Sequence, residues 1–204
     1  TLFGRDALAM RLDDCTPCVL VTNEEKAELA ADREGLKVVV ADDALLETLR
    51  EFPVEFDVST GSRDMALFQY TSGTTREMPE AVKHTHQSVV TVTIASLYAT
   101  GVRPGDNYCC PSSPAWGHGL AHGTIGPLAL GVNITAWSGQ FNPERMLQVL
   151  QDYEITNLSA AATHYRMMKN SGVADEFTNS IKKLSFTGEP IDTDTCLLYT
   201  SPSP

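Results

Sequence analysis

The chain has 204 residues, of which 42% are hydrophobic, enough for one sizeable core in a folded α/β protein. Lys and Arg number 15 against 26 Asp and Glu, for a net charge of −11, and the basic residues do not cluster. We therefore expect no nucleic-acid partner, because a polyanion would be repelled. No apolar run approaches the roughly 20 residues that cross a bilayer, so we expect no membrane span.

The start of the chain and its cysteines favour a cytoplasmic protein. The first residues show neither a basic start before an apolar stretch nor a cleavage site, so no secretory signal is visible. The chain lacks an initiator Met, and we expect the natural protein to begin upstream. Its five cysteines are odd in number and include Cys15, Cys18 and the adjacent pair Cys109 and Cys110, a poor disulfide framework. We predict reduced thiols.

Strand and helix patterns alternate along the chain. The first half predicts a strand at 19–22, a helix at 24–33, a strand at 36–41, a helix at 44–50, a loop at 53–64 and a strand at 65–70. The second half predicts a helix at 87–100, a strand at 107–110, a helix at 120–130, a strand at 132–137, a helix at 143–153, a strand at 155–160, a helix at 163–170 and a strand at 183–187. Asn142 should cap the helix that begins at Pro143.

This alternation predicts a layered α/β fold with a largely parallel sheet and flanking helices, in which ligand sites lie beyond the carboxyl ends of the strands. We assign residues 1–195 to one partial domain. Residues 196–204 follow without continuing any helix, and we interpret them as a non-native tail derived from library construction.

A loop rich in hydroxyls directly follows the strand that ends at Tyr70. The predicted phosphate-binding residues share small or hydroxylated side chains: Thr71, Ser72, Gly73, Thr74 and Thr75. Hydroxyls can donate to phosphate oxygens, and Gly73 lets backbone N–H groups approach an anion closely. An ordinary Ser/Thr-rich turn is the alternative for this stretch taken alone. The spacing fits neither the Walker A nor the Rossmann glycine pattern.

Residues 70–86 read Tyr-Thr-Ser-Gly-Thr-Thr-Arg-Glu-Met-Pro-Glu-Ala-Val-Lys-His-Thr-His. This stretch resembles the signature loop of the superfamily of acyl-CoA synthetases, adenylation domains and luciferases, Tyr-Thr-Ser-Gly-Thr-Thr-Gly-x-Pro-Lys-Gly-Val-x-His-Thr-His. The resemblance covers roughly residues 10–194. Residues 11–22 resemble the strand entry of that fold. Gly188, Glu189 and Pro190 resemble the segment that cradles the adenine of ATP in acetyl- and medium-chain acyl-CoA synthetases.

The resemblance implies an ATP-dependent acid:CoA ligase of carboxylate or fatty acid metabolism, here as a partial N-terminal domain. A carboxylate would attack the α-phosphate of ATP and expel pyrophosphate, and the CoA thiol would then capture the acyl-adenylate. ATP, Mg²⁺ and CoA are the implied cofactors and co-substrate. Two alternatives stay open: a non-catalytic nucleotide- or phosphate-binding module, and an adenylation enzyme that loads a carrier-protein thiol.

The loop departs from the family pattern near its middle. Arg76 stands where the family has glycine, and Glu80 and Ala81 replace the lysine and the last glycine, with one extra residue in the loop. A carboxylate in place of a cation should weaken triphosphate binding by Coulomb repulsion. We expect Arg76 to supply the missing positive charge.

A second group of candidates follows a Pro/Ser-rich loop, where the family places an aromatic residue or His near the acyl pocket. Trp116, His118 and Gly119 are therefore substrate-side candidates, against the alternative of a packed loop. His118 and His122 share a helical spacing, but the HExxH zinc pattern needs a Glu where Gly119 stands, so we predict no metal ligands.

Several motifs of the family follow the Gly-Glu-Pro segment in its members and do not occur in these residues. They are the Tyr-Gly-x-Thr-Glu loop, the ribose-binding Asp, the hinge, and the C-terminal domain with the catalytic Lys. We therefore assign no catalytic residue, and we expect no acyl-CoA formation by the isolated chain.

Overall fold

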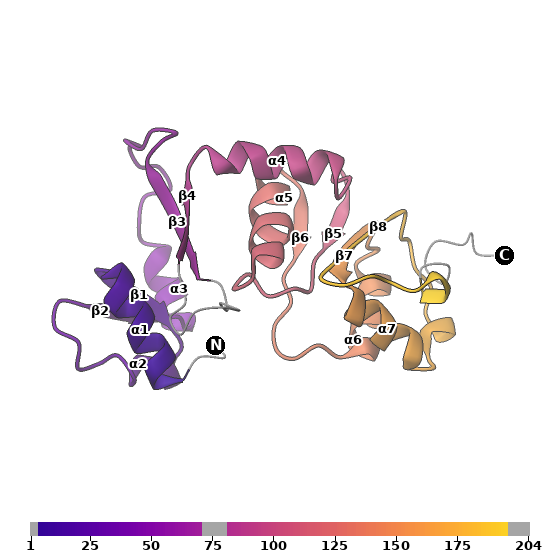
Figure 1. The fold of residues 1–204 in the computed structure, drawn as a ribbon, viewed down its shortest axis with the longest axis horizontal. Helices are drawn as coiled ribbons and strands as arrows, with labels where there is room; N and C mark the ends of the chain where they lie inside the picture. The colour runs from indigo at the N-terminus through magenta and orange to yellow at the C-terminus, as the bar shows by residue number, and fades with distance from the viewer. Residues whose placement is uncertain (1–3, 71–80, 196–204) are drawn as a thin grey trace. The chain divides into compact units, whose positions relative to one another are not determined.

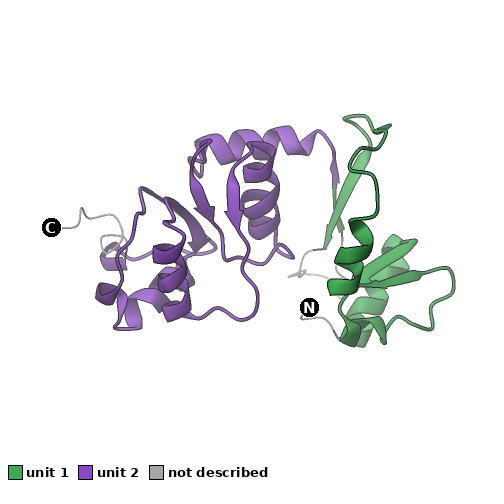
Figure 2. Ribbon diagram, turned by 180° about the vertical axis from the view of Figure 1, so that it is seen from behind, with its two compact units in different colours: residues 1–83 green, residues 84–204 purple. Residues whose placement is uncertain are grey.

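The computed structural model describes residues 4–70 and 81–195. The phosphate-loop candidates Thr71 to Thr75, Arg76 and the tail at 196–204 lie outside the described residues. The chain divides into two compact units, residues 1–83 and 84–204, which Figure 2 colours separately. No helix in the described parts of the chain is long and apolar enough to cross a membrane.

The first unit contains short elements with little buried surface. Its elements, in chain order, are α1 (Arg5–Cys15), β1 (Val19–Thr22), α2 (Glu24–Ala27), β2 (Lys37–Val40), α3 (Asp43–Leu49), β3 (Met65–Tyr70) and β4 (Ala81–Thr85), whose last residues belong to the second unit. Strands β1 and β2 pair in parallel, with Val19 opposite Lys37, while β3 pairs with β4. Figure 1 shows both strand pairs.

The second unit is built on a four-stranded sheet in the order β6-β5-β7-β8, and every neighbouring pair is parallel. Its elements are α4 (Ser88–Tyr98), β5 (Asn107–Cys109), the π-helix η1 (His118–Ile125), α5 (Gly126–Ala129), β6 (Asn133–Thr135), α6 (Pro143–Asp152), β7 (Asn157–Ala161), α7 (Ala162–Asn170), the 3-10 turn η2 (Ala174–Glu176) and β8 (Lys183–Thr187). The predicted α/β fold with a parallel sheet is confirmed.

Strand alternation sends neighbouring side chains of the sheet to opposite faces. Cys109 and Leu158 are fully buried among the apolar side chains of α6 and α7. Tyr108, the neighbour of Cys109, joins Val102 and Val132 in a second buried cluster on the other face. The helical pattern in α6 is the strongest in the chain, because Met146, Leu147 and Leu150 all point into the first cluster and are buried. The core of this unit therefore lies on both faces of the sheet.

Two expectations about local structure are corrected. Helix α2 spans only Glu24–Ala27 of the predicted 24–33, because it buries no side chain and short helices need packing to persist. The strand predicted at 19–22 is confirmed, and the residues before it are helical up to Cys15. Helix 120–130 is instead η1 followed by α5, a change from π- to α-helix at Gly126 just before Pro127.

Two predicted details of the second unit are confirmed. The side chain of Asn142 accepts a hydrogen bond from the Arg145 amide at 2.8 Å, and Pro143 occupies the first turn of α6. Strand β8 spans Lys183–Thr187 as expected. Strand β4, at Ala81–Thr85, was not predicted from the sequence.

Candidate functional site

The residue that precedes the predicted phosphate loop is held by α1. The Tyr70 hydroxyl, at the end of β3, donates a hydrogen bond of 2.6 Å to an Asp14 carboxylate oxygen. The Arg11 guanidinium lies 5.5 Å from the centre of the Tyr70 ring. Burial and the hydrogen bond to Asp14 raise the pKa of Tyr70, which keeps the hydroxyl protonated as a donor. These contacts hold the end of β3 against α1. Residues 71–75 follow directly in the sequence.

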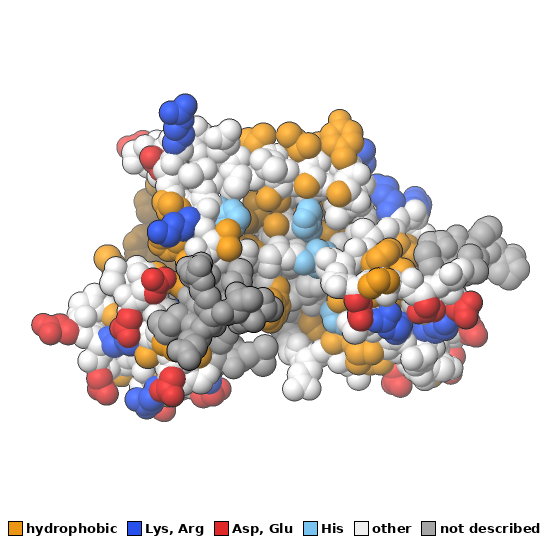
Figure 3. Space-filling view, viewed as in Figure 1, with side chains coloured by type: hydrophobic (Ala, Val, Ile, Leu, Met, Phe, Trp, Pro, Cys, Tyr) orange, Lys and Arg blue, Asp and Glu red, His pale blue; other side chains and the backbone are white. Residues whose placement is uncertain are grey.

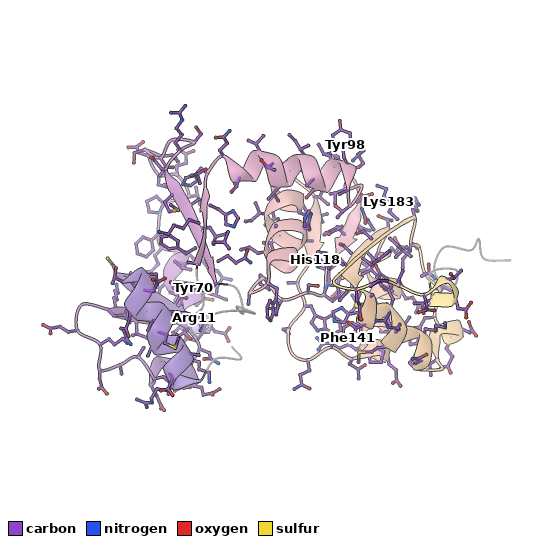
Figure 4. The ribbon with its side chains drawn as sticks, viewed as in Figure 1. Arg11, Tyr70, Tyr98, His118, Phe141 and Lys183 are labelled. Carbon is purple, nitrogen blue, oxygen red and sulfur yellow. The ribbon has the colours of Figure 1, made fainter. Side chains whose placement is uncertain are left out.

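Among the substrate-side candidates, His118 has a side chain that is hydrogen-bonded to other described residues. Its Nε2 lies 2.9 Å from Ser159 Oγ and its Nδ1 lies 3.0 Å from Ser112 Oγ, so both ring nitrogens are hydrogen-bonded. Ser185 Oγ donates to Ser159 Oγ at 2.8 Å, and Ser159 is 1% exposed. A polar chain thus runs from β8 through β7 to the first turn of η1, where Figure 4 labels His118.

Two further histidines surround His118. The rings of His118 and His122 are 6.0 Å apart, and His164, at the start of α7, stacks on Phe141 with ring centres 4.1 Å apart. Burial lowers the pKa of all three, and His122 and His164 lower that of His118 further through charge repulsion. Figure 3 shows histidine side chains on this face, between α5 and α7. The cluster is therefore neutral at pH 7.

The other two substrate-side candidates differ from His118. The Trp116 side chain is 52% exposed, and its carbonyl oxygen accepts from the Leu120 amide at the start of η1. Gly119 is buried against backbone: a Cβ there would lie 2.2 Å from the Ser113 carbonyl oxygen. Gly119 thus fits the packed-loop alternative, while Trp116 is exposed.

The Gly-Glu-Pro segment forms the turn at the carboxyl end of β8. Gly188 has a φ of +94°, a conformation that residues with a Cβ rarely adopt. Apart from its two chain neighbours, no described residue lies within 4 Å of a Cβ placed there. The Glu189 carboxylate forms an ion pair with the Arg166 guanidinium of α7. Arg166 also donates to the Pro190 carbonyl oxygen at 3.1 Å. The turn is therefore held by α7 through Glu189 and Pro190, whereas the space beside Gly188 is open among the described residues.

The cysteines of the described residues carry no disulfide. Burial raises the pKa of the Cys109 thiol to about 12 and also raises that of Cys110. Both thiols therefore stay protonated and unreactive at neutral pH. They pack on opposite faces of the sheet.

Sequence reasoning missed the residues that hold the candidates in place: Ser112, Ser159, Ser185, His164 and Arg166. Ser159 and Ser185 lie inside strands, and only the register that sets them opposite each other shows that they touch. Arg166 is one charge on an amphipathic helix, and its partner lies 23 residues further along the chain at Glu189. No local pattern predicts such a contact.

The sheet is parallel, helices lie on both of its faces, and polar turns lie at its carboxyl edge. These features define an α/β protein. In proteins of this class, ligands bind at the carboxyl edge of the sheet. The chain belongs to the AMP-binding enzyme family, whose model matches residues 1–199. Its relatives include acyl-CoA synthetases.

Two curated relatives illustrate the similarity in sequence. The 3-hydroxybenzoate–CoA ligase of Aromatoleum sp. (strain CIB) is 31% identical over 129 residues, which are 63% of this chain and 24% of that protein. The acetyl-coenzyme A synthetase of Coprinopsis cinerea is 26% identical over 231 residues, 93% of this chain and 34% of that protein. The chain thus spans about a quarter to a third of the length of these relatives.

Solved structures agree on the fold. A Brucella canis acyl-CoA synthetase superposes with a TM-score of 0.83 at 22% identity, covering 96% of this chain and 38% of that one. A benzoate CoA ligase from Burkholderia xenovorans LB400 gives a TM-score of 0.83 at 18% identity, covering 98% of this chain and 42% of that one. The expected fold of adenylate-forming enzymes is therefore confirmed.

Proposed function

We propose that the intact protein is an ATP-dependent acid:CoA ligase that activates a carboxylate as an acyl-adenylate and transfers the acyl group to CoA. The observation that carries the proposal is the position of the Gly-Glu-Pro turn, which directly follows β8 at the carboxyl edge of the parallel sheet. Family membership and the Thr-Ser-Gly-Thr-Thr sequence after β3 support it.

On the turn side, the Gly-Glu-Pro segment would hold the adenine ring. Gly188 has no side chain, which would let a flat ring approach the backbone closely. Thr71, Ser72, Gly73, Thr74 and Thr75 would donate to the phosphates, and bound Mg²⁺ would offset their charge. His118, hydrogen-bonded between two hydroxyls, and the exposed Trp116 would lie on the acyl side. The domain assignment of 1–195 belongs to the same proposal.

The first test is nucleotide binding by the chain. We expect isothermal titration calorimetry to detect Mg-ATP binding, and Ser72→Ala to weaken it about tenfold or more, because a hydrogen bond to a charged group contributes about 1.5–3 kcal/mol. Ser59→Ala, in the exposed loop before β3, is the matched control. Failure of the wild-type chain to bind Mg-ATP, or equal affinity in Ser72→Ala, would contradict the proposal.

Arg76 is proposed to replace the family's loop lysine. We expect Arg76→Ala to weaken Mg-ATP but not adenosine, because only the polyphosphate senses the cation. Arg63→Ala removes the same charge from an exposed position and serves as the control. Equal affinities of wild type and Arg76→Ala for Mg-ATP would refute this role.

The thiol acceptor distinguishes the ligase from a carrier-loading enzyme. The curated relatives described above are CoA ligases or synthetases by name, whereas one structural neighbour is an A-PCP complexed with phenylalanyl-adenylate. In the intact protein, pyrophosphate release that depends on an acid, followed by acyl-CoA formation, would support the ligase. Acylation of a carrier protein without acyl-CoA would favour the other enzyme.

A further inference from the structure

The turn after β8 is held from outside by one helix. Arg166 of α7 forms the ion pair with the Glu189 carboxylate, and its Nη1 donates to the Pro190 carbonyl oxygen at 3.1 Å. One turn further along α7, Lys169 Nζ lies 3.4 Å from an Asp192 carboxylate oxygen. Two cations of α7 thus meet two acids of the segment that follows β8.

The spacing of these charges explains why the contacts form together. Arg166 and Lys169 are three residues apart and therefore lie on the same side of α7. Their partners Glu189 and Asp192 are also three residues apart. Helix α7 follows β7 directly, and β7 pairs in parallel with β8, so the helix runs back beside the end of β8. In Figure 3, acidic and basic side chains alternate on the side where α7 lies.

The ion pair changes the interpretation of Glu189. The family resemblance places Glu189 in the segment that cradles adenine, and in the structure its carboxylate is paired with Arg166. A free carboxylate beside ATP would repel the polyphosphate, whereas a paired one presents little net charge. Arg166 restrains the turn at two successive residues, because it contacts the Glu189 side chain and the Pro190 backbone.

We propose that Arg166 is a positioning residue that holds the Glu189-Pro190 turn in the conformation that receives the adenine, and that Glu189 acts through Arg166 without touching the nucleotide. This inference rests on the proposed function, because that function places a nucleotide at the turn. Its structural half, the restraint of the turn by α7, can be measured without any nucleotide.

The test compares Arg166→Ala, Glu189→Ala and the charge-exchanged Arg166→Glu/Glu189→Arg double variant. Calorimetry with AMP reports mainly on the turn, because AMP lacks the β- and γ-phosphates of ATP and so depends less on the loop after Tyr70. We expect each single variant to weaken AMP binding about fivefold, and the exchanged pair to return within about twofold of wild type, since the ion pair forms again in reverse. Met167→Ala, an exposed neighbour on α7, should bind AMP like wild type.

Direct contact between Glu189 and the nucleotide predicts a different pattern. Glu189→Ala would then weaken AMP binding while Arg166→Ala would not, and the exchanged pair would stay weak. Either result would overturn the proposal. The losses should also shrink at high salt, because both side chains are partly exposed, at 32% and 45%.

Hydrogen exchange separates failure of this inference from failure of the proposed function. We expect the amides of Gly188, Glu189 and Ile191 to exchange faster in both single variants than in wild type, with recovery in the exchanged pair. Unchanged exchange in Arg166→Ala would overturn the positioning role whether or not nucleotide binds. Faster exchange in a chain whose wild type binds neither AMP nor Mg-ATP would leave the restraint standing and refute the nucleotide site.

Discussion

At the scale of single residues, His118, His122 and His164 are set apart by their burial. His118 has hydrogen bonds at both ring nitrogens, whereas the Nδ1 atoms of His122 and His164 are buried with no hydrogen-bond partner among the described residues. A buried polar atom without a hydrogen-bond partner costs stability.

The burial of His118, His122 and His164 makes stability depend on pH. Their folded-state pKa values are lowered below the unfolded value of about 6.5, so the unfolded chain binds protons first. Their contribution is complete above about pH 6.5 and is lost as the pH falls from there toward the folded pKa values. We expect the free energy of unfolding, measured with urea, to fall more between pH 7.5 and 5.5 in wild type than in a His122→Gln/His164→Gln variant. The same change in both proteins would contradict this prediction.

At the scale of elements, the packing of η1 depends on glycine. A Cβ at Gly119 would lie 2.2 Å from the Ser113 carbonyl oxygen and 2.4 Å from that of Ser112, and backbone cannot move aside as a flexible side chain can. We expect Gly119→Ala to lower the free energy of unfolding by about 1–3 kcal/mol or more. The urea midpoint measures this effect.

A matched glycine substitution tests whether close packing at Gly119 is the cause of the lost stability. At Gly61 the nearest atom to an added Cβ is an Asp64 carboxylate oxygen at 3.7 Å, an ordinary contact. Gly61→Ala should therefore change stability by less than about 0.5 kcal/mol. Equal effects of the two substitutions would mean that close packing of η1 is not the reason.

One ion pair joins strand β8 to the loop before β5. Lys183 Nζ, at the start of β8 and labelled in Figure 4, donates to the Asp106 carboxylate at 2.8 Å and to the Gly101 carbonyl oxygen at 2.9 Å. Burial alone would raise the pKa of Asp106, but hydrogen bonds from Lys183, the Arg103 amide and Asn157 lower it. The pair connects the start of β8 to the loop before β5.

Removal of the Lys183 cation should destabilise the fold, because the Asp106 carboxylate would lose its ion-pair partner. We expect Lys183→Met to lower the free energy of unfolding by about 1–3 kcal/mol, because Asp106 is left with its charge only 11% exposed. Lys182→Met removes the same charge at the exposed neighbouring position and should have little effect on the urea midpoint. A similar loss in both variants would show that net charge, and not this contact, is responsible.

At the scale of the whole molecule, buried apolar side chains are unevenly divided between the two units. Among the described residues, Leu12 and Ala30 are the buried hydrophobic residues of the first unit, and all the others belong to the second. Local stability follows buried contacts. We expect amide hydrogen exchange, followed by mass spectrometry, to be slowest in β5 and β7 and much faster in β1 and β2. Equal protection of both strand pairs would contradict this expectation.

The sequence by itself determined the alternating α/β order, the parallel class of sheet, the cap of α6 at Asn142 and the family. These features depend on local patterns or on contiguous motifs, which a linear reading captures. The sequence-based prediction was wrong about the length of α2 and the type of helix at η1. Helix α2 buries no side chain, and η1 packs closely at Gly119 against the backbone of Ser112 and Ser113.

Tertiary structure alone decided how the candidate residues are held. The hydroxyls of Ser159 and Ser185 meet because β7 and β8 pair in one register. The Ser159 hydroxyl in turn is hydrogen-bonded to His118, which lies far away in the chain at the start of η1. Arg166 reaches Glu189 because α7 runs back beside β8. Such contacts join residues far apart in the chain, and their free energy depends on distance and burial, which a sequence pattern does not contain. The sequence therefore named the family and its candidate segments, and the folded chain determined which side chains position them.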